Sequence, residues 1–288
     1  MKPSSGTCDG KMKTLKTTGE MKAYRDGLSG FVGLVPTMGF LHEGHLSLVR
    51  KCNTECSHTL VSIFVNPTQF GPNEDFASYP RDIDRDLTLL ELTGTDAVFL
   101  PSAEEMYPPG IDTLVVPGRI AERLEGAVRP GHFNGVATVV LKLFNLVQPH
   151  RAYFGQKDAQ QAAVIHKMVT DLNLPVDLSV MPTVREADGL AMSSRNSYLS
   201  MDERQAAAII YRALTRAENL ISLGERDTEI IKRRMTELIN TESLASIDYI
   251  SIADAVSLEE LPFFRKPALI SLAVRIGKTR LIDNIKLS

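Results

Sequence analysis

The 288-residue chain has no tryptophan, only three cysteines and no long apolar run, and each absence excludes a class of protein. Three cysteines, Cys8, Cys52 and Cys56, cannot build the disulfide framework of a small secreted domain, so we expect a protein of the reducing cytoplasm. No run of about 18 apolar residues occurs, so we expect no transmembrane helix. The segment Met1–Thr18 has lysines but no apolar core like that of a signal peptide, and we expect it to be a frayed lead-in.

The chain also lacks a strong charge of either sign. Lysine and arginine number 32 against 35 aspartates and glutamates, and no long basic run is present, so we do not expect nucleic acid to be the main partner. With 43% hydrophobic residues the chain can bury a large core, as one large or two modest domains. Cys52, Cys56 and His58 lack a fourth ligand at a useful spacing, so we interpret the cysteines as small core residues rather than metal ligands.

Short apolar runs alternate with helical patterns over the first two-thirds of the chain, which predicts an α/β fold with a parallel sheet and helices on both faces. The expected strands are Phe31–Val35, Leu60–Val65, Ala97–Leu100, Ala152–Phe154 and Val176–Met181. The expected helices are Leu46–Cys56, Ile83–Leu92, Val136–Val147 and Ala159–Leu172. Ligands of such sheets bind at the carboxyl ends of the strands, near a switch in strand order.

The pattern changes near residue 185, where helices and then strands follow without alternation. We expect two helices, Asp202–Leu223 and Asp227–Asn240, and then the strands Ile247–Ile252, Ala268–Val274 and Arg280–Ile282. This order predicts a smaller C-terminal α+β domain that acts as a cap. The expected domains are therefore residues 1–185 and 186–288.

The most informative stretch is Pro36–His45, which follows the apolar run Phe31–Val35 and precedes a helical pattern. A helix start presents unpaired backbone N–H groups and the positive end of the helix dipole, which suit phosphate. Gly39 lets the backbone approach a ligand closely, and His42 and His45 can donate protons or hydrogen bonds to phosphoryl oxygens. From these residues alone, two solvated histidines near a helix cap remain an alternative interpretation.

The second stretch, Phe64–Asn73, begins at the end of a predicted strand and continues into proline and glycine. Its side chains Asn66 and Gln69 offer neutral donors and acceptors, which suit the recognition of hydroxyl and carboxyl groups. An ordinary polar loop is the alternative.

Three aspartates, Asp82, Asp84 and Asp86, lie at the start of the next predicted helix. Acidic residues in this position stabilise the helix dipole, so capping is the preferred interpretation, and a Mg²⁺ role for one of them stays open.

The third stretch, Gly155–Gln161, lies between a predicted strand and a predicted helix. Gly155 permits a close backbone approach and Lys157 can place a point charge on a phosphate. Gln161, one turn into the helix, can face the same cavity, whereas Asp158 can serve as the helix N-cap. A capped helix with a surface lysine is the alternative.

The fourth stretch, Val184–Asn196, spans the predicted domain junction. The hydroxyls of Ser193 and Ser194 and the guanidinium of Arg195 suit a triphosphate. Asp188–Gly189 marks a turn that allows hinging.

A fifth stretch, Leu124–Val136, has three glycines before an apolar helix. We interpret it as a shaped loop capped by Asn134, and both a wall of the substrate cavity and a subunit contact stay open for it.

Together these stretches resemble a known family. His42–His45 is similar to the signature of the HIGH nucleotidyltransferase superfamily, and Met192–Asn196 resembles the mobile KMSKS loop of the same superfamily. With the blocks at Asn66–Gln69 and Gly155–Gln161 between them, the span from about residue 34 to residue 199 resembles the pantoate–β-alanine ligase family. The resemblance implies a Rossmann-like parallel sheet with helices on both faces, plus the smaller C-terminal domain.

The family joins (R)-pantoate to β-alanine with ATP and Mg²⁺, forms a pantoyl adenylate, and releases AMP and pyrophosphate. The resemblance therefore implies that the partners are the small molecules pantoate, β-alanine and ATP, with Mg²⁺ as cofactor. It further implies a cytoplasmic homodimer with neither a nucleic acid nor a membrane as partner.

The resemblance also assigns roles by position. His45 is expected as the catalytic residue, where the family has its proton donor; Gln69 would bind pantoate and β-alanine, Gln161 would bind pantoate, and Asp86 matches a position linked to Mg²⁺. The expected ATP-binding residues are Met38, Gly39, Phe40, Leu41, His42, Glu43, Gly44, His45, Gly155, Gln156, Lys157, Asp158, Val184, Met192, Ser193, Ser194 and Arg195.

Two residues depart from the family pattern. Phe40 stands where many members have alanine, and Gln156 replaces the glutamate that often precedes the lysine. Other activities of the superfamily, those of a cytidylyltransferase or a truncated aminoacyl-tRNA synthetase, explain fewer of the motifs, and the latter needs a basic tRNA-binding module. A non-catalytic nucleotide-binding module is an alternative of a different class.

Overall fold

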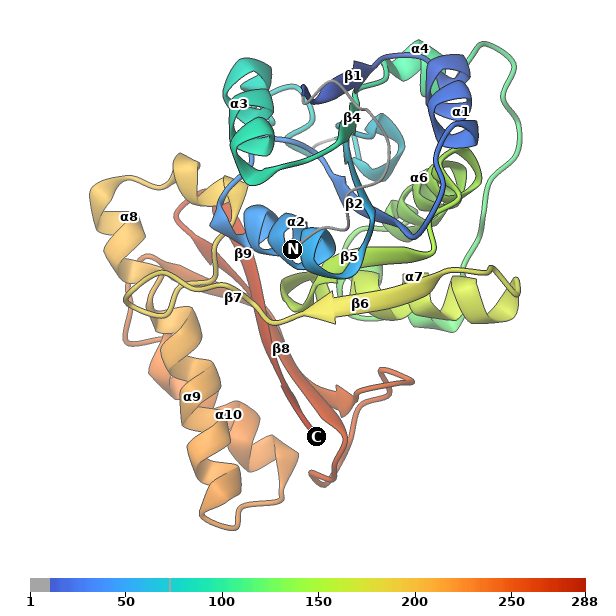
Figure 1. Ribbon diagram of the computed structural model, residues 1–288. Coiled ribbons are helices and arrows are strands. Elements are labelled where there is room, and N and C mark those ends of the chain that lie inside the picture. The colour runs from blue at the N-terminus through green and yellow to red at the C-terminus, as the bar shows by residue number, and fades with distance from the viewer. Residues whose placement is uncertain (1–10, 73) are drawn as a thin grey trace.

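The computed structural model describes residues 11–72 and 74–288, and these residues form two units (Figure 1). The first unit is built on a sheet of six strands in the order β1-β4-β3-β2-β5-β6, and every neighbouring pair is parallel. Its strands are β1 (Lys13–Leu15), β2 (Val32–Thr37), β3 (His58–Ile63), β4 (Ala97–Phe99), β5 (Arg151–Gly155) and β6 (Asp177–Met181). The predicted α/β fold with a parallel sheet is confirmed.

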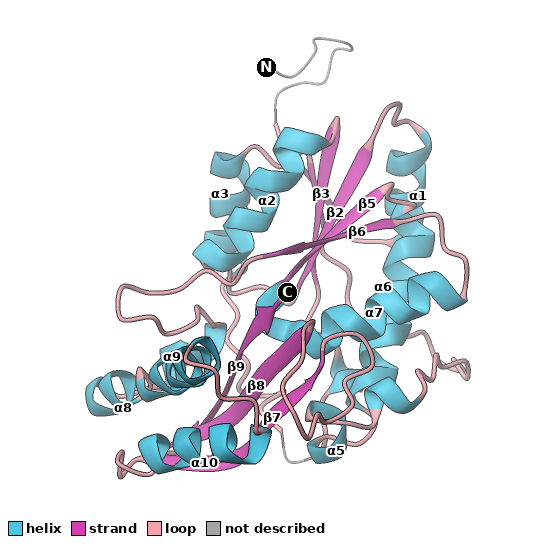
Figure 2. Cartoon of the chain, turned by 90° about the horizontal axis from the view of Figure 1, so that it is seen from below, coloured by secondary structure: helices cyan, strands magenta, loops and turns pink. Residues whose placement is uncertain are grey.

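Helices cover both faces of this sheet, as Figure 2 shows. On one face lie α1 (Thr18–Asp26), α6 (His132–Val147) and α7 (Ala159–Asp171), and on the other lie α2 (Glu43–Glu55) and α3 (Ile83–Thr93). Because successive side chains of a strand point to opposite faces, Val32 and Leu34 enter the first core and Val35 enters the second. The shorter helical segments are α4 (Ala103–Met106), α5 (Glu125–Val128), η1 (Pro67–Gln69), η2 (Arg119–Ala121), η3 (Gln156–Asp158) and η4 (Ser194–Tyr198).

The two described cysteines are core residues, as predicted. Both are buried and form no disulfide. Cys52 lies in the last turn of α2, and Cys56 is the C-cap residue of this helix, one turn further on. A Cβ atom added to Gly33 of β2 would lie 2.2 Å from the Sγ of Cys52 and 2.6 Å from the Sγ of Cys56. The two sulfur atoms therefore occupy the space that a side chain at position 33 would need. Cys8 lies outside the described residues.

The order of the strands places the site. From β2 the chain moves outward through β3 and β4 on one side, and β5 and β6 then continue on the other side of β2. The direction of winding therefore switches between β2 and β5, and in sheets of this kind ligands bind outside the carboxyl ends of the strands at such a switch. The chain leaves β2 after Thr37, β3 after Ile63 and β5 after Gly155, and all three of these ends lie at this edge.

The second unit is an antiparallel sheet of three strands in the order β7-β8-β9, with helices packed on it. Its elements are α8 (Met201–Ala206), α9 (Ile209–Ser222), α10 (Thr228–Ile239), β7 (Ala245–Asp254), β8 (Ala268–Ile276) and β9 (Thr279–Leu287). Apolar side chains of α9 and α10 form one core with those of β8, among them Leu214, Ile231 and Ile270. The predicted α+β unit is confirmed, and among the described residues no helix is long and apolar enough to cross a membrane.

The segment between the two units runs from the end of β6 to η4. Met181 packs against the core of the parallel sheet, whereas Leu190 belongs to the core of the C-terminal unit. The boundary predicted at residues 185 and 186 lies within this segment and stays a prediction.

The interpretation of Met1–Thr18 as a frayed lead-in is wrong from Lys13 onward; residues 1–10 lie outside the described part. β1 pairs with β4, and α1 begins at Thr18. Thr17 caps this helix: its hydroxyl accepts a bond from the N–H of Glu20, whose carboxylate accepts from the N–H of Thr17.

The helix predicted over residues 202–223 is two helices, α8 and α9. Between them the N–H groups of Ala208 and Ile210 donate to carbonyls three residues back, at 3.3 and 3.1 Å. Such bonds tighten the chain, and neither glycine nor proline marks the break.

Candidate active site

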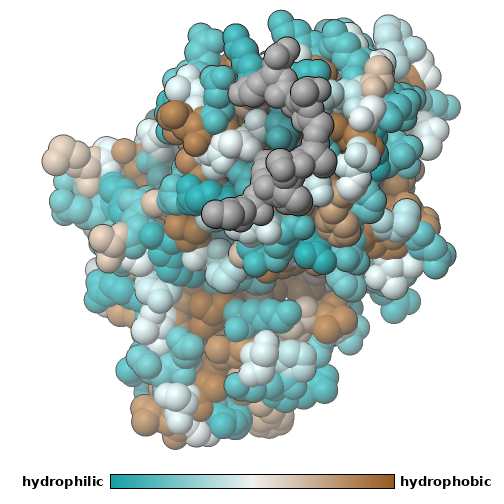
Figure 3. Space-filling model, in the orientation of Figure 1, coloured by the Kyte–Doolittle hydropathy of each residue, from teal (hydrophilic) through white to brown (hydrophobic). Residues whose placement is uncertain are grey.

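A cavity of about 1090 Å³ lies where the carboxyl edge of the parallel sheet faces β8 and β9. Its walls come from both units, and its volume lies slightly above the usual range for small-molecule sites, about 300–1000 Å³. The cavity can therefore hold more than one small molecule. On the face seen in Figure 3, hydrophilic side chains predominate, and hydrophobic ones show between the two units.

The turn after β2 brings two histidines to the wall of this cavity. The chain passes through Gly39 and Phe40 at φ angles of 83° and 49°, and α2 then begins with His42 as its N-cap. The Nδ1 of His42 accepts a hydrogen bond from the N–H of Gly44 at 3.1 Å, and the Nδ1 of His45 accepts one from the N–H of His42 at 3.3 Å. The ring centroids are 4.1 Å apart.

Burial sets the charge of both rings, and the hydrogen bonds set which nitrogen of each ring carries the proton. Burial lowers the pKa of His42 to about 4, aided by the positive charge of Lys157, and burial together with His42 lowers that of His45 to about 3. Both imidazoles are therefore neutral at pH 7. Since each Nδ1 is an acceptor, each Nε2 carries the proton and is left to donate a hydrogen bond into the cavity.

The turn itself is held from behind by α3. The carboxylate of Asp86 accepts hydrogen bonds from the N–H groups of Phe40 and Leu41, both at 2.7 Å, and its side chain has no exposed surface. The Phe40 ring lies near the guanidinium of Arg85, 5.4 Å from the ring centroid, and neither Phe40 nor Asp86 lines the cavity. The departure at position 40 therefore leaves the ligand space unchanged.

The second stretch supplies an amide aimed at the cavity. Asn66 donates to the Oε1 of Gln69 at 3.1 Å and to the carbonyl of Gly135 at 3.1 Å, while its own Oδ1 accepts from Thr68. Gln69 is thus oriented with its Nε2 near the Sδ of Met38, at 3.1 Å. α6 approaches η1 so closely that a Cβ on Gly135 would lie 2.4 Å from the carbonyl oxygen of Thr68.

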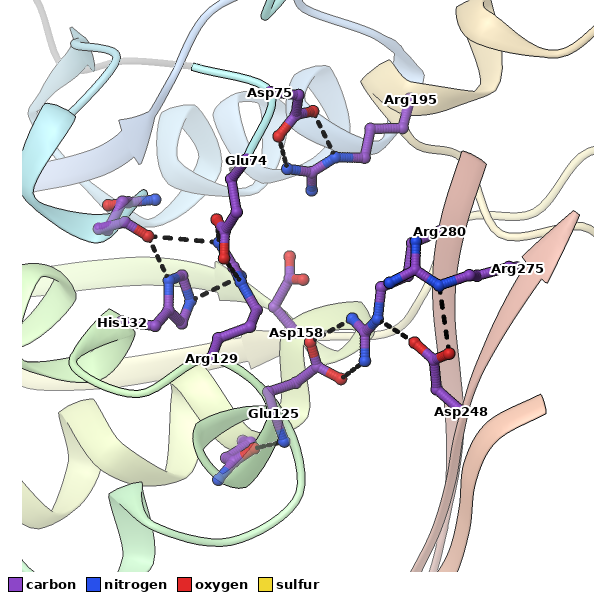
Figure 4. A network of polar contacts seen from close by, with 12 residues as sticks. Glu74, Asp75, Glu125, Arg129, His132, Asp158, Arg195, Asp248, Arg275 and Arg280 are labelled. Carbon is purple, nitrogen blue, oxygen red and sulfur yellow. Dashed lines mark hydrogen bonds and ion pairs between the residues drawn. The ribbon is translucent and has the colours of Figure 1, made fainter. Parts of the chain in front are cut away.

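The backbone of Gln69 is also held in place. The Nδ1–H of His132 donates to its carbonyl at 2.8 Å, and Arg129 donates to the same oxygen at 3.3 Å. Arg129 also bonds the Nε2 of His132 and forms a bidentate pair with Glu74 (Figure 4). Burial and the Arg129 charge lower the pKa of His132 to about 4, so this ring too is neutral at pH 7.

The stretch after β5 places a lysine and a carboxylate in the cavity. Lys157 Nζ lies 3.4 Å from Asp158 Oδ1. Burial opposes ionisation of Asp158, but the charge and hydrogen bond of Lys157 together with the charge of Arg195 more than offset it, and the pKa of Asp158 is lowered. Asp158 is the N-cap residue of α7 and makes no capping bond with its side chain. Gln156 instead turns to Asn284 of β9, at 2.9 Å.

The fourth stretch contacts the first one and the segment that follows the second. Ser194 donates to the carbonyl of Phe40 at 3.2 Å, and Arg195 forms a bidentate pair with Asp75 at 2.9 and 2.8 Å. Burial raises the pKa of Asp75, but its pair with Arg195 more than offsets this and lowers it. The guanidinium of Arg195 also lies 6.0 Å from the ring centroid of Tyr79.

Paired charges join the two units around the cavity. Arg280 of β9 donates twice to Glu125 of α5, at 2.6 and 2.9 Å, and once to Asp248 of β7 (Figure 4). Glu125 is held in turn, because its N–H donates to Gln160 at 2.9 Å. Arg185, in the connecting segment, forms a second bidentate pair with Asp283 of β9, at 2.6 and 3.1 Å.

Most of the predicted site residues line this one cavity. They are Met38, His42, Gly44, His45, Gln69, Gly155, Lys157, Asp158, Gln161, Val184, Met192, Ser193, Ser194 and Arg195. The predicted residues that do not line it are Gly39, Phe40, Leu41, Glu43, Asp86 and Gln156. Glu43 is exposed and pairs with Arg50.

Other cavity residues had no assigned role. Leu124–Val136 is a wall of the cavity, through Glu125, Arg129 and His132 among others, and a subunit contact stays a prediction for it. The prediction that Asn134 caps this loop is wrong, because α6 begins at His132 and its N-cap is Gly131. The φ angle of Gly131 is 83°, a left-handed value that favours glycine, and no side chain caps the helix. The glycine–histidine pattern could have pointed to His132 beside Gly131, but only the fold places it on Gln69.

Comparisons with known proteins point to one family along nearly the whole chain. A family model described as pantoate-beta-alanine ligase matches residues 11–286. The pantothenate synthetase of Roseiflexus castenholzii is 59% identical over 273 residues, which are 95% of this chain and 98% of that protein. The crystal structure of pantothenate synthetase from Thermus thermophilus superposes with a TM-score of 0.91 at 47% identity, covering 96% of this chain and 99% of that one.

A further solved structure is the pantoate-beta-alanine ligase of Francisella tularensis, complexed with beta-gamma ATP and beta-alanine. It has a TM-score of 0.79 at 35% identity and covers 96% of this chain and 97% of that one. By the match of the family model and the identity to these relatives, the chain belongs to the pantoate–β-alanine ligase family.

Proposed function

We propose that the chain joins (R)-pantoate to β-alanine in the cavity between its two units, through a pantoyl adenylate, and releases AMP and pyrophosphate. One observation carries this proposal: the donors suited to phosphate and the amides suited to pantoate converge on a single cavity. The Francisella relative, solved with beta-gamma ATP and beta-alanine, supports ATP and β-alanine as ligands here.

The nucleotide half of the cavity is the start of α2 with Lys157 and Arg195. The Nε2–H groups of His42 and His45 and the Nζ of Lys157 donate to phosphate oxygens, where the helix dipole adds its field. Ser193, Ser194 and Arg195 close over the phosphates, and Val184 and Met192 contact the base. For Arg195 this requires that Asp75 share or release its guanidinium.

The pantoate half is built around two glutamines and an apolar wall. Because Asn66 occupies the Oε1 of Gln69, the Nε2 of Gln69 is the group that donates to the carboxylate or hydroxyl of pantoate and then to β-alanine. Gln161 of α7, which lines the same cavity, donates a second hydrogen bond to pantoate. Val139 and Leu143 of α6 form an apolar wall that suits the dimethyl carbon of pantoate.

The chemistry then runs in two displacements. A carboxylate oxygen of pantoate attacks the α-phosphorus, the new P–O bond forms, and the bond to pyrophosphate breaks. The amine of β-alanine next attacks the acyl carbon, the C–O bond to AMP breaks, and the amine loses a proton to solvent. The protein contributes position and fixed donors, so neutral His45 stabilises developing charge with a hydrogen bond rather than delivering a proton from an imidazolium.

We propose Mg²⁺ as the metal that accompanies ATP. Mg²⁺ typically binds phosphates together with one or two carboxylates and, when bound, neutralises phosphate charge. Asp158 fits this role, because its carboxylate lines the cavity beside Lys157. Among the described residues no group of three or more histidine, cysteine or acidic side chains could hold a metal alone.

We also propose a cytoplasmic homodimer. Free, buried Cys52 and Cys56 support a reducing compartment. Leu114 and Val116 are 60% and 70% exposed in a segment without strand pairing, which supports burial against a second copy. Light scattering on the Leu114→Ser/Val116→Ser variant tests this: a monomer where the unmodified chain is a dimer supports the proposal, and an unchanged dimer contradicts this interface.

The activity is tested by measuring AMP with the purified chain. AMP must form only when ATP, pantoate and β-alanine are all present, and ATP with pantoate alone must release no more than one pyrophosphate for each active site. Replacement of ATP by CTP, or of β-alanine by tRNA, must abolish the product. AMP formation without pantoate would overturn the proposal.

A further inference from the structure

We propose that Asp86 is a positioning residue for adenylation: its carboxylate holds the backbone of Phe40 and Leu41 and thereby fixes where the His42 and His45 rings point. The inference rests on the proposed function, because it concerns the turn that receives the phosphates. It assigns to Asp86 a task different from the metal role that its position in the family suggests.

The contacts of Asp86 are complete without a ligand. Oδ2 accepts the N–H of Phe40 and Oδ1 accepts the N–H of Leu41, each at 2.7 Å, and the side chain is fully buried. Burial raises the pKa of Asp86, while the two N–H groups favour its carboxylate form. Two short bonds to a carboxylate are among the stronger hydrogen bonds in proteins. Asp86 is part of α3, so these bonds anchor the turn to a helix of the core rather than to another loop.

The turn needs such an anchor because its backbone is unusual. Gly39 and Phe40 both have left-handed φ angles, 83° and 49°, and the second belongs to an aromatic residue that disfavours that region. The space is also tight, since a Cβ on Gly39 would lie 3.1 Å from Asp86 Oδ2. Leu41 directly precedes His42, the N-cap of α2, so any rotation of the turn moves both imidazoles.

The neighbouring aspartates show what distinguishes Asp86. Asp82 is exposed and caps α3 by accepting the N–H of Arg85 at 3.2 Å. Asp84 is exposed, and only its backbone carbonyl accepts a side-chain bond, from Thr88. All three carry the same charge near the same helix end, but only the Asp86 carboxylate reaches the turn.

A metal role is a poorer fit to the same geometry. The Asp86 carboxylate points to backbone N–H groups and does not line the cavity. Asp158 does line it, beside Lys157. A cation on the phosphates would therefore meet Asp158 first.

The test compares Asp86→Asn with Asp84→Asn, which removes the same charge from the same helix turn without touching the turn after β2. Single-turnover pyrophosphate release from ATP, Mg²⁺ and pantoate is measured, together with ATP binding by calorimetry. We expect Asp86→Asn to slow release about 10- to 100-fold, with a smaller change in the Kd for ATP, and Asp84→Asn to leave both the rate and the Kd within about twofold. Equal rates in the two variants would overturn the proposal.

Two further readouts separate positioning from a metal or a merely structural role. Phe40→Gly in the Asp86→Asn background is expected to recover part of the lost rate, because glycine takes a left-handed φ without strain. The Mg²⁺ concentration for half-maximal rate is expected to stay unchanged in Asp86→Asn. A rate restored by excess Mg²⁺, with no recovery from glycine, would assign Asp86 to the metal and overturn the proposal.

A measurement on the unmodified chain covers the case in which Asp86→Asn does not fold. The amide protons of Phe40 and Leu41, followed by NMR, are expected to exchange with solvent far more slowly than those of the exposed Asp82–Asp84 segment. Fast exchange at Phe40 and Leu41 would contradict the clamp. Failure of the unmodified chain to release pyrophosphate, with both amides protected, would instead contradict the proposed function alone.

Discussion

The parallel sheet and the antiparallel sheet border the same cavity with different kinds of polar group. At the end of the parallel sheet, the Nε2–H groups of His42 and His45 make no hydrogen bond to any described residue, and the Nε2 of Gln69 contacts only the Sδ of Met38 among them. On the antiparallel sheet, Arg280 is already bound to Glu125 and Asp248. The free donors of the first sheet face the ligand space, and the pairs of Arg280 join the two units, so we infer that the first sheet mainly binds ligands and the second mainly closes the site.

The difference follows from the way each sheet ends. Every strand of the parallel sheet leaves its carboxyl end at one edge, so the turns after β2, β3 and β5 gather their backbone N–H groups there. In the antiparallel sheet neighbouring ends alternate, and what reaches the cavity is mainly side chains of β8 and β9, with Tyr249 of β7. Removal of groups from the two sheets should therefore affect different measured quantities.

The largest effect is expected from Arg280→Met, which breaks the link between the units. The side chain of Glu125 is only 8% exposed and would be left as a buried, unpaired carboxylate. We expect the free energy of unfolding to fall by about 3 kcal/mol, measured by chemical denaturation. The control Arg234→Met breaks the exposed pair with Glu237 on α10 and should cost less than about 1 kcal/mol. Equal losses in the two variants would mean that the inter-unit pair is no stronger than a surface pair.

The next effect is on rate rather than on stability. His45→Ala removes a fixed donor from the phosphate end of the cavity, and we expect the adenylation rate to fall about 100-fold or more while the melting temperature changes little. ATP–pyrophosphate exchange measures this rate. His166→Ala, an exposed histidine on α7, is the matched control and should behave like the unmodified chain. Near-normal exchange in His45→Ala would refute the role of the α2 start.

A smaller effect is expected from Gln69→Ala, which removes one amide from the pantoate half. We expect kcat/KM for pantoate to fall about 10-fold, the equivalent of one hydrogen bond to a charged group, with ATP binding unchanged. Steady-state kinetics with varied pantoate gives the ratio, and Gln205→Ala on the surface of α8 is the control. Unchanged pantoate kinetics would remove Gln69 from the substrate site.

The smallest effect concerns pH. Because the pKa values of His42 and His45 are lowered to about 4 and about 3, both rings stay neutral from pH 8 to pH 6, and we expect the single-turnover rate to change by less than about twofold. A single-turnover rate that rises as the pH falls, with a midpoint between pH 6 and 7, would show that a charged histidine is needed.

The same shifts predict the direction of the stability change. In the unfolded chain these histidines take up protons below about pH 6.5, while the folded chain keeps them neutral down to about pH 4. Their contribution is therefore present above pH 6.5 and is lost as the pH falls from there toward 3. Denaturation at a series of pH values measures this loss, and the His42→Asn/His45→Asn variant should show a shallower slope.

Much of the site could be predicted because its parts are local. The motif after β2, the amides after β3 and the lysine after β5 each follow an apolar strand, and parallel strands bring such turns to one edge. β1 was missed because a three-residue strand has no periodicity of its own and depends on pairing with β4. The start of α1 had a local signal, the Thr17 and Glu20 capping box.

The rest could not be predicted because it depends on contacts over long sequence distances. Glu125 and Arg280 are 155 residues apart, and nothing local distinguishes them from surface charges. Asp86 resembles its neighbours Asp82 and Asp84 until α3 packs behind the turn after β2. The split between α8 and α9 likewise lies among alanines, which favour a continuous helix.

The capping bonds of the two histidines also have a consequence for inhibition. Zinc and copper bind imidazole through a nitrogen lone pair, and the Nδ1 lone pairs of His42 and His45 already accept backbone N–H groups. Two histidines three residues apart would otherwise attract such metals. This pair is protected from adventitious metal, and a compound designed against it should carry an anionic acceptor and not a metal-chelating group.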